Sequence, residues 1–88
     1  MREEILNSLK GINCLEEDFG NEVSCCFEDV ENEIIVSDLN TTNNIDNIEC
    51  EVYSVHEDIE GAEEFILYVN VTIDEETEEK NIEVIEVN

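Results

Sequence analysis

The sequence predicts an α+β fold in which an N-terminal helix packs on an antiparallel sheet of about four to five strands. Two observations predict this class. Apolar residues follow helical spacing near the start of the chain, and from Glu22 onward they alternate with polar residues. Alternation with a period of two is typical of strands that bury one face. Short polar connections between these segments favour an antiparallel meander with the helix on one side.

The chain is predicted to form one domain that spans residues 1–88. This length suits a single domain with a thin core. No proline, repeat or Gly/Ser-rich linker divides the sequence. Hydrophobic residues make up 41% of the chain, many of them in alternating runs, and this content argues against a disordered acidic protein.

The first half of the chain contains one predicted helix and one predicted hairpin. Residues 2–10 are expected to be helical, because apolar side chains recur at helical spacing and Gly11 follows the last turn. Residues 12–21 are expected to form a loop, with a further helical turn over "CLEEDF" left open. Residues 22–30 and 33–39 are expected to pair as a hairpin around "ENE".

The second half is predicted to be three strands. Asn-rich residues 40–47 are expected to form a polar loop before a strand over 48–56. Residues 64–73 are the most regular strand, with five apolar side chains on one face: Phe65, Leu67, Val69, Val71 and Ile73. Residues 81–87 form the last strand, and the shift in its apolar phase predicts a bulge or burial on both faces.

The charge of the chain excludes direct binding of nucleic acid. There are 26 acidic and 3 basic residues, and the segment from Gly11 to Glu79 contains 22 acidic residues and no Lys or Arg. Affinity for phosphates comes from Lys and Arg side chains that neutralise them. A net charge of −23 also opposes compactness through self-repulsion. The alternative that this charge serves only to keep the protein in solution remains open.

Localisation is predicted to be cytoplasmic. No apolar run approaches the length of a membrane span, and the N-terminal residues lack the pattern of a secretory signal. Cysteines in that compartment are expected to be free thiols. None of the four has C-x-x-C spacing, and adjacent residues on a strand would point to opposite faces. The four cysteines are Cys14, Cys25, Cys26 and Cys50.

No catalytic activity, cofactor or metal is expected. His56 lies six residues from Cys50 on one predicted strand, about 20 Å away, whereas a nucleophile and its base need about 3 Å. The sequence has no phosphate-binding glycine loop and no known catalytic motif. The acidic segment that begins at Asp74 lacks the Gly and Glu of a calcium-binding loop, with Glu79 and Ile85 in those places.

Carboxylates on a folded scaffold are predicted to contact a basic nucleic-acid-binding protein. Alternate strand residues are about 6.6–6.8 Å apart, close to two nucleotide rises of about 3.4 Å. Glu49 and Glu51 are expected to continue into the next connection as one run of charge. That connection and the "DEETEE" turn flank residues 64–73, about 30 Å apart. The predicted contact residues are Asp74, Glu75, Glu76, Glu78, Glu79, Glu57, Asp58, Glu60, Glu63, Glu64, Glu49 and Glu51.

In size, charge and class the whole chain resembles the small acidic inhibitors that phages and mobile elements encode. These are DNA-mimic anti-restriction proteins and, more closely, anti-CRISPR proteins. The resemblance implies an inhibitor that occupies the DNA-binding cleft of a CRISPR effector nuclease, and no aligned motif assigns it to particular residues. An acidic immunity protein or antitoxin that caps a nuclease has the same electrostatic profile. A protein-binding module with another target also remains open.

Overall fold

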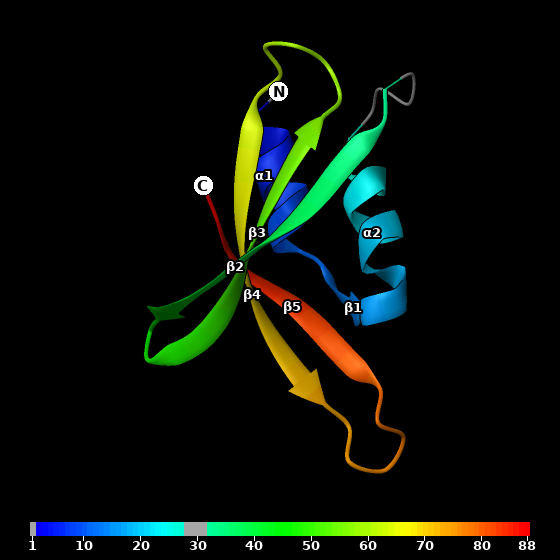
Figure 1. Ribbon diagram of the computed structural model, residues 1–88, viewed down its shortest axis with the longest axis vertical. Coiled ribbons are helices and arrows are strands. Elements are labelled where there is room, and N and C mark those ends of the chain that lie inside the picture. The colour runs from blue at the N-terminus through cyan, green and yellow to red at the C-terminus, as the bar shows by residue number, and fades with distance from the viewer. Residues whose placement is uncertain (1, 28–31) are drawn as a thin grey trace.

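A computed structural model, which describes residues 2–27 and 32–88, has the predicted α+β class (Figure 1). The described residues form two helices and one antiparallel sheet with strand order β1-β5-β4-β3-β2. Strands β2 to β5 are consecutive hairpins, and β1 pairs with the outer edge of β5. The elements are α1 (Arg2–Lys10), β1 (Asn13–Leu15), α2 (Glu16–Cys25), β2 (Ile34–Ile45), β3 (Ile48–Glu57), β4 (Glu64–Ile73) and β5 (Lys80–Val87).

Helix α1 confirms the prediction for residues 2–10. Leu9 is fully buried, acidic Glu3 and Glu4 lie in the first turn of the helix, and Lys10 ends it. This order of charges suits the helix dipole, which is positive at its start and negative at its end. The backbone N–H of Gly11 donates to the Ser8 carbonyl at 3.2 Å and closes the last turn.

Helix α2 replaces the loop and the strand that the sequence predicted for this region. The loop over 12–21 is wrong, because residues 13–15 form β1 and α2 follows at once, whereas the helical turn left open over "CLEEDF" coincides from Glu16 onward with the start of α2. The hairpin over 22–30 and 33–39 is wrong because residues 22–25 belong to α2, and residues 28–30 lie outside the described part, but its second strand is confirmed by the start of β2. Phe19 and Val23 are buried on one face of the helix. Their spacing of four is helical, and the alternation of Val23 with Cys25 concealed it.

Strand β2 extends through most of the segment that was predicted to be a polar loop. The prediction for residues 40–47 is wrong, since β2 continues to Ile45 and only Asp46 and Asn47 form the turn to β3. Both turn residues have positive φ, 51° and 67°. Asn and Asp tolerate this left-handed region well. An edge strand can carry polar residues along its exposed length, so a run of Asn and Thr is compatible with β structure here.

The hydrophobic core lies between the two helices and one face of β3, β4 and β5. Phe65 of β4 meets Phe27 edge to face at a ring-centroid distance of 5.8 Å. Phe19 of α2 meets Tyr53 of β3 in the same way at 5.5 Å. Along β4, Phe65, Leu67 and Val69 are buried as predicted, Val71 is half-buried, and Ile73 is 61% exposed. The core therefore ends where β4 passes beyond the helices.

Two bulges divide the far end of the sheet into two arms. The pairing of β2 with β3 shifts between Asp38 and Thr42, and that of β4 with β5 shifts between Tyr68 and Val69. The second shift leaves Ile85 as an extra residue of β5 and confirms the predicted bulge. Both shifts lie level with the last β3–β4 pair, Glu51 with Val69. Bulges increase the local twist, which accounts for the divergence of the two hairpins (Figure 1).

We call residues 42–51 the β2–β3 arm and residues 70–81 the β4–β5 arm. The space between them is the fork. Figure 1 shows the two arms separating toward the lower edge, while the β3–β4 connection and the N-terminus of the chain lie at the opposite end. The longest dimension of the molecule, 40 Å, runs between these two ends. The fork is therefore remote from the end of the sheet that α1 covers.

Candidate partner-binding surface

The turn between β4 and β5 is fixed by hydrogen bonds to Asp74. Its carboxylate accepts hydrogen bonds from the backbone N–H groups of Glu76 at 2.8 Å and Thr77 at 3.4 Å. Its carbonyl accepts from the N–H of Glu78 at 2.8 Å, and Glu78 adopts a positive φ of 62°. Asp74 is thus occupied in shaping the turn. The four glutamates of the turn keep exposed side chains: Glu75, Glu76, Glu78 and Glu79.

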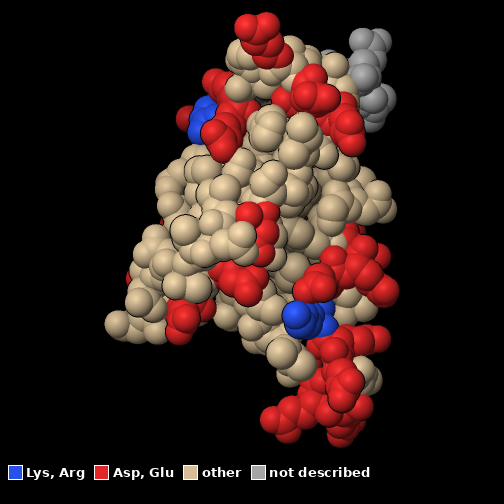
Figure 2. Space-filling model, viewed as in Figure 1, with Lys and Arg blue, Asp and Glu red and all other residues tan. Residues whose placement is uncertain are grey.

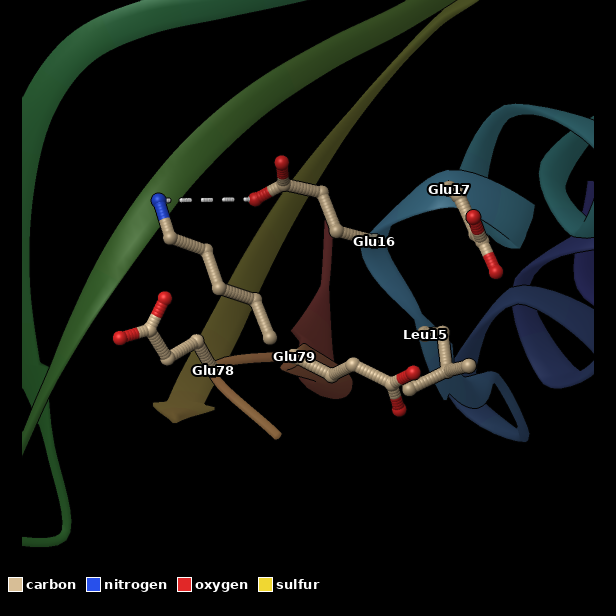
Figure 3. A pocket seen from close by; sticks show the side chains of 6 residues that line it. Leu15, Glu16, Glu17, Glu78 and Glu79 are labelled. Carbon is tan, nitrogen blue, oxygen red and sulfur yellow. Dashed lines mark ion pairs between the residues drawn. The ribbon is translucent and has the colours of Figure 1, made fainter. Parts of the chain in front are cut away.

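The start of α2 brings two further carboxylates beside the turn of the β4–β5 arm. A shallow hollow of about 260 Å³ lies there, lined by Leu15, Glu16, Glu17, Glu78, Glu79 and Lys80 (Figure 3). The Lys80 ammonium lies 3.8 Å from a Glu16 carboxylate oxygen. One ammonium against four carboxylates leaves the hollow negative. Sequence reasoning did not include Glu16 and Glu17 in the site, although acidic residues in a first helical turn are a recognisable signal.

The β2–β3 arm adds Glu49 and Glu51 to the same end of the molecule. A second hollow of about 260 Å³ lies between the arms and is lined by Thr42, Glu49, Cys50, Glu51 and Val71. The Tyr53 hydroxyl donates to the Glu51 carboxylate at 3.1 Å. Burial raises the pKa of Tyr53 to about 12, with added effects from the nearby charges of Glu51, Asp38 and Glu16. Carboxylates from three elements therefore surround this phenol.

The predicted continuous run of charge along β3 does not form. Glu49 and Glu51 lie at the start of β3, whereas Glu57 ends the strand and Asp58 and Glu60 follow it. The residues between them include Val52, Ser54 and Val55, which are buried. A strand that is buried on both faces in its middle cannot present a row of carboxylates along its length. The predicted contact residues therefore fall into two separate groups.

The second group surrounds the β3–β4 connection, and two of its five carboxylates, those of Glu63 and Glu64, contact other parts of the fold. The Arg2 guanidinium pairs with the Glu63 carboxylate at 3.2 Å and lies 4.5 Å above the centre of the Phe65 ring. Buried Ser54 donates to a Glu64 carboxylate oxygen at 2.6 Å. Half-buried Glu57 lines a hollow of about 160 Å³ with Arg2, Ile5, Phe27, Glu63 and Phe65. Asp58 and Glu60 of this group are exposed.

Figure 2 shows how these carboxylates are distributed over one face of the molecule. Acidic side chains gather over the β4–β5 turn at one end and over the β3–β4 connection at the other. Most of the surface between the two ends is uncharged in this view. The structure thus places the two connections at opposite ends of β4, as the sequence predicted, without a continuous band of charge on this face.

Three of the four thiols are affected by burial. Burial raises the pKa of the Cys14, Cys26 and Cys50 thiols, which disfavours the nucleophilic thiolate. Cys25 and Cys26 lie at the end of α2 and its cap instead of in the predicted strand. The His56 Nδ1 atom is buried and has no hydrogen-bond partner among the described residues. Within residues 2–27 and 32–88, no three potential metal ligands converge on one point.

The chain matches no protein-family model, no curated protein sequence and no solved structure. No helix of the described part is long and apolar enough to cross a membrane. The geometry therefore carries the functional argument alone. It defines a small α+β scaffold with an acidic, exposed surface made by the β4–β5 turn, the start of α2 and the start of β3.

Proposed function

We propose that this protein is a small acidic inhibitor, encoded by a phage or mobile element, that occupies the basic DNA-binding cleft of a CRISPR effector nuclease. It acts in the cytoplasm of the host cell, has no enzymatic activity and needs no cofactor. The partner is a protein, because a surface with 22 acidic residues and no basic residue from Gly11 to Glu79 repels nucleic acid.

The observation that carries this proposal is the exposed group of glutamates on the hydrogen-bonded β4–β5 turn. Glu75, Glu76 and Glu78 sit on a turn that Asp74 holds in shape. Side chains on a preorganised scaffold lose less conformational entropy on binding than those of a disordered acidic tail. Exposed carboxylates also accelerate encounter with a basic surface. Both properties suit a competitor of DNA.

A gel-shift assay tests the proposal on guide-loaded CRISPR effectors and their target DNA. One equivalent of the protein is expected to abolish the shift of target DNA by its effector, while the protein alone shifts no DNA. A complex that contains effector, DNA and inhibitor together would contradict competition. If the protein instead displaced DNA from a toxin nuclease and had no effect on any CRISPR effector, it would be an immunity protein and its target would be the toxin.

A further inference from the structure

Within the described part of the chain, the strands on the two sides of the fork are each hydrogen-bonded to a neighbouring strand along one edge only. Beyond the pair of Glu51 with Val69, residues 48–50 continue to pair with β2 and residues 70–73 with β5. Among the described residues, no β3–β4 pair joins these two stretches. A strand edge has backbone N–H and C=O groups directed away from its partner strand, and such edges receive segments of other chains. The fork is therefore an opening within the sheet, bounded by two strand edges.

Side chains along the fork combine apolar surface with carboxylates. Ile73 on the β4–β5 arm is 61% exposed and, by strand alternation, lies on the same face of the sheet as Val71, Glu49 and Glu51, whereas Ile48, which is 42% exposed, lies on the other face. Glu49 and Glu51 line the hollow between the arms together with half-buried Val71. An apolar centre with a polar rim is the usual composition of a protein–protein interface.

We infer that the fork receives a segment of the partner protein that carries Arg or Lys side chains. This inference rests on the proposed function and assigns its contact surface. The aliphatic stems of such side chains fit against Val71 and Ile73, while their cationic ends reach Glu49 and Glu51 on the same face of the sheet. Lys80 gives an internal example, since its ammonium approaches Glu16 at 3.8 Å beside the β4–β5 arm. A second copy of the chain is a poor occupant, because each copy carries a net charge of −23.

The test uses an octa-arginine peptide as the probe and follows the backbone amide NMR signals of the whole chain. We expect the largest shifts at residues 48–51 and 70–73, on the two sides of the fork. Ile73→Ser is expected to weaken peptide binding roughly fivefold without changing its salt dependence. The matched control is Ile59→Ser in the β3–β4 connection, where Ile59 is 47% exposed among acidic residues. This control is expected to leave the affinity unchanged.

Equal losses from Ile73→Ser and Ile59→Ser, or shifts spread over both ends of the sheet, would overturn the assignment to the fork. A dimer that forms through the fork in the absence of peptide would overturn it as well. These outcomes leave the proposed function intact, because displacement of DNA from an effector is measured separately. Conversely, peptide binding in the fork without displacement of DNA from any effector supports the basic occupant and contradicts the proposed function.

Discussion

The two ends of β4 carry similar numbers of carboxylates, but the fold uses them differently. At the β3–β4 connection, Glu63 pairs with Arg2 and Glu64 accepts a hydrogen bond from buried Ser54. At the β4–β5 turn, Asp74 and Thr77 accept hydrogen bonds from the backbone, and the glutamates beside them project into solvent. We call the first the closed end and the second the open end. Clusters of similar charge therefore differ in their contacts with the rest of the fold, and the hydrogen bonds and the ion pair show which carboxylates are engaged.

The largest expected difference between the two ends concerns apolar residues of the same strand. Phe65 and Ile73 are eight residues apart on one face of β4, yet Phe65 is 2% exposed and Ile73 is 61% exposed. We expect Phe65→Ala to lower the free energy of unfolding by about 3–5 kcal/mol. Ile73→Ala should change it by less than about 0.5 kcal/mol. Urea unfolding of both variants measures this difference, and similar losses would show that the core extends to the open end.

A smaller effect is expected where the closed end uses a carboxylate as a hydrogen-bond acceptor. Ser54 is 4% exposed and donates to Glu64 at 2.6 Å. Ser54→Ala should lower the free energy of unfolding by about 1 kcal/mol, the usual net value of one such hydrogen bond. Glu64→Gln keeps an acceptor oxygen and should cost less. If Glu64→Gln proved as damaging as Ser54→Ala, the charge of Glu64 would matter more than its hydrogen bond.

The smallest expected effect concerns Tyr53, which lies where the covered part of the sheet meets the open end. Burial, aided by the charge of Glu51, raises its pKa from 10.0 to about 12. The folded state therefore holds the phenolic proton more tightly, so this contribution to stability is full below about pH 10 and is lost toward about pH 12. Glu51→Gln should lower the pKa by a fraction of a unit, because it removes a neighbouring anion.

Phenolate absorbance measures this titration in a Tyr68→Phe background, which leaves Tyr53 as the one tyrosine. The matched control is Glu60→Gln at the closed end, which should leave the Tyr53 pKa unchanged. An identical titration in the Glu51→Gln and Glu60→Gln variants would mean that the charge of Glu51 does not act on Tyr53. The raised pKa would then come from burial and the charges of Asp38 and Glu16.

Periodicity in the sequence was sufficient for α1, β3, β4 and β5, because each has a single clear pattern of apolar residues. The bulge in β5 was also predicted, since an extra residue shifts that pattern. Helix α2 was missed because Val23 satisfies a helical spacing with Phe19 and an alternating one with Cys25. Local pattern cannot decide between the two. Packing against distant strands decides it.

The sequence showed which residues of the site carry carboxylates. It did not show which of them contact the rest of the fold, because those contacts join residues that are far apart in the chain. Arg2 and Glu63 are separated by 61 positions, so no local pattern indicates their ion pair. The fork likewise arises from two bulges on different hairpins that lie level with each other only in the folded sheet. Glu16 and Glu17 join the open end because α2 begins there, and the sequence left open only a single helical turn in this segment.

Competition between this protein and target DNA for a CRISPR effector, with each acidic end altered in turn, tests the central claim most directly. The open-end variant replaces Glu75, Glu76, Glu78 and Glu79 by Gln. The closed-end control replaces Glu57, Glu60, Glu63 and Glu64 by Gln and Asp58 by Asn. Unfolding of each variant is measured alongside, so that loss of fold is distinguished from loss of contact.

We predict that the open-end variant keeps its fold and competes at least roughly tenfold more weakly, with a shallower dependence on salt. The closed-end control should compete almost as well as the unaltered protein wherever it remains folded. The contradictory result is a closed-end variant that loses competition while the open-end variant retains it. The partner would then bind at the β3–β4 connection, and the exposed glutamates of the β4–β5 turn would have no part in binding.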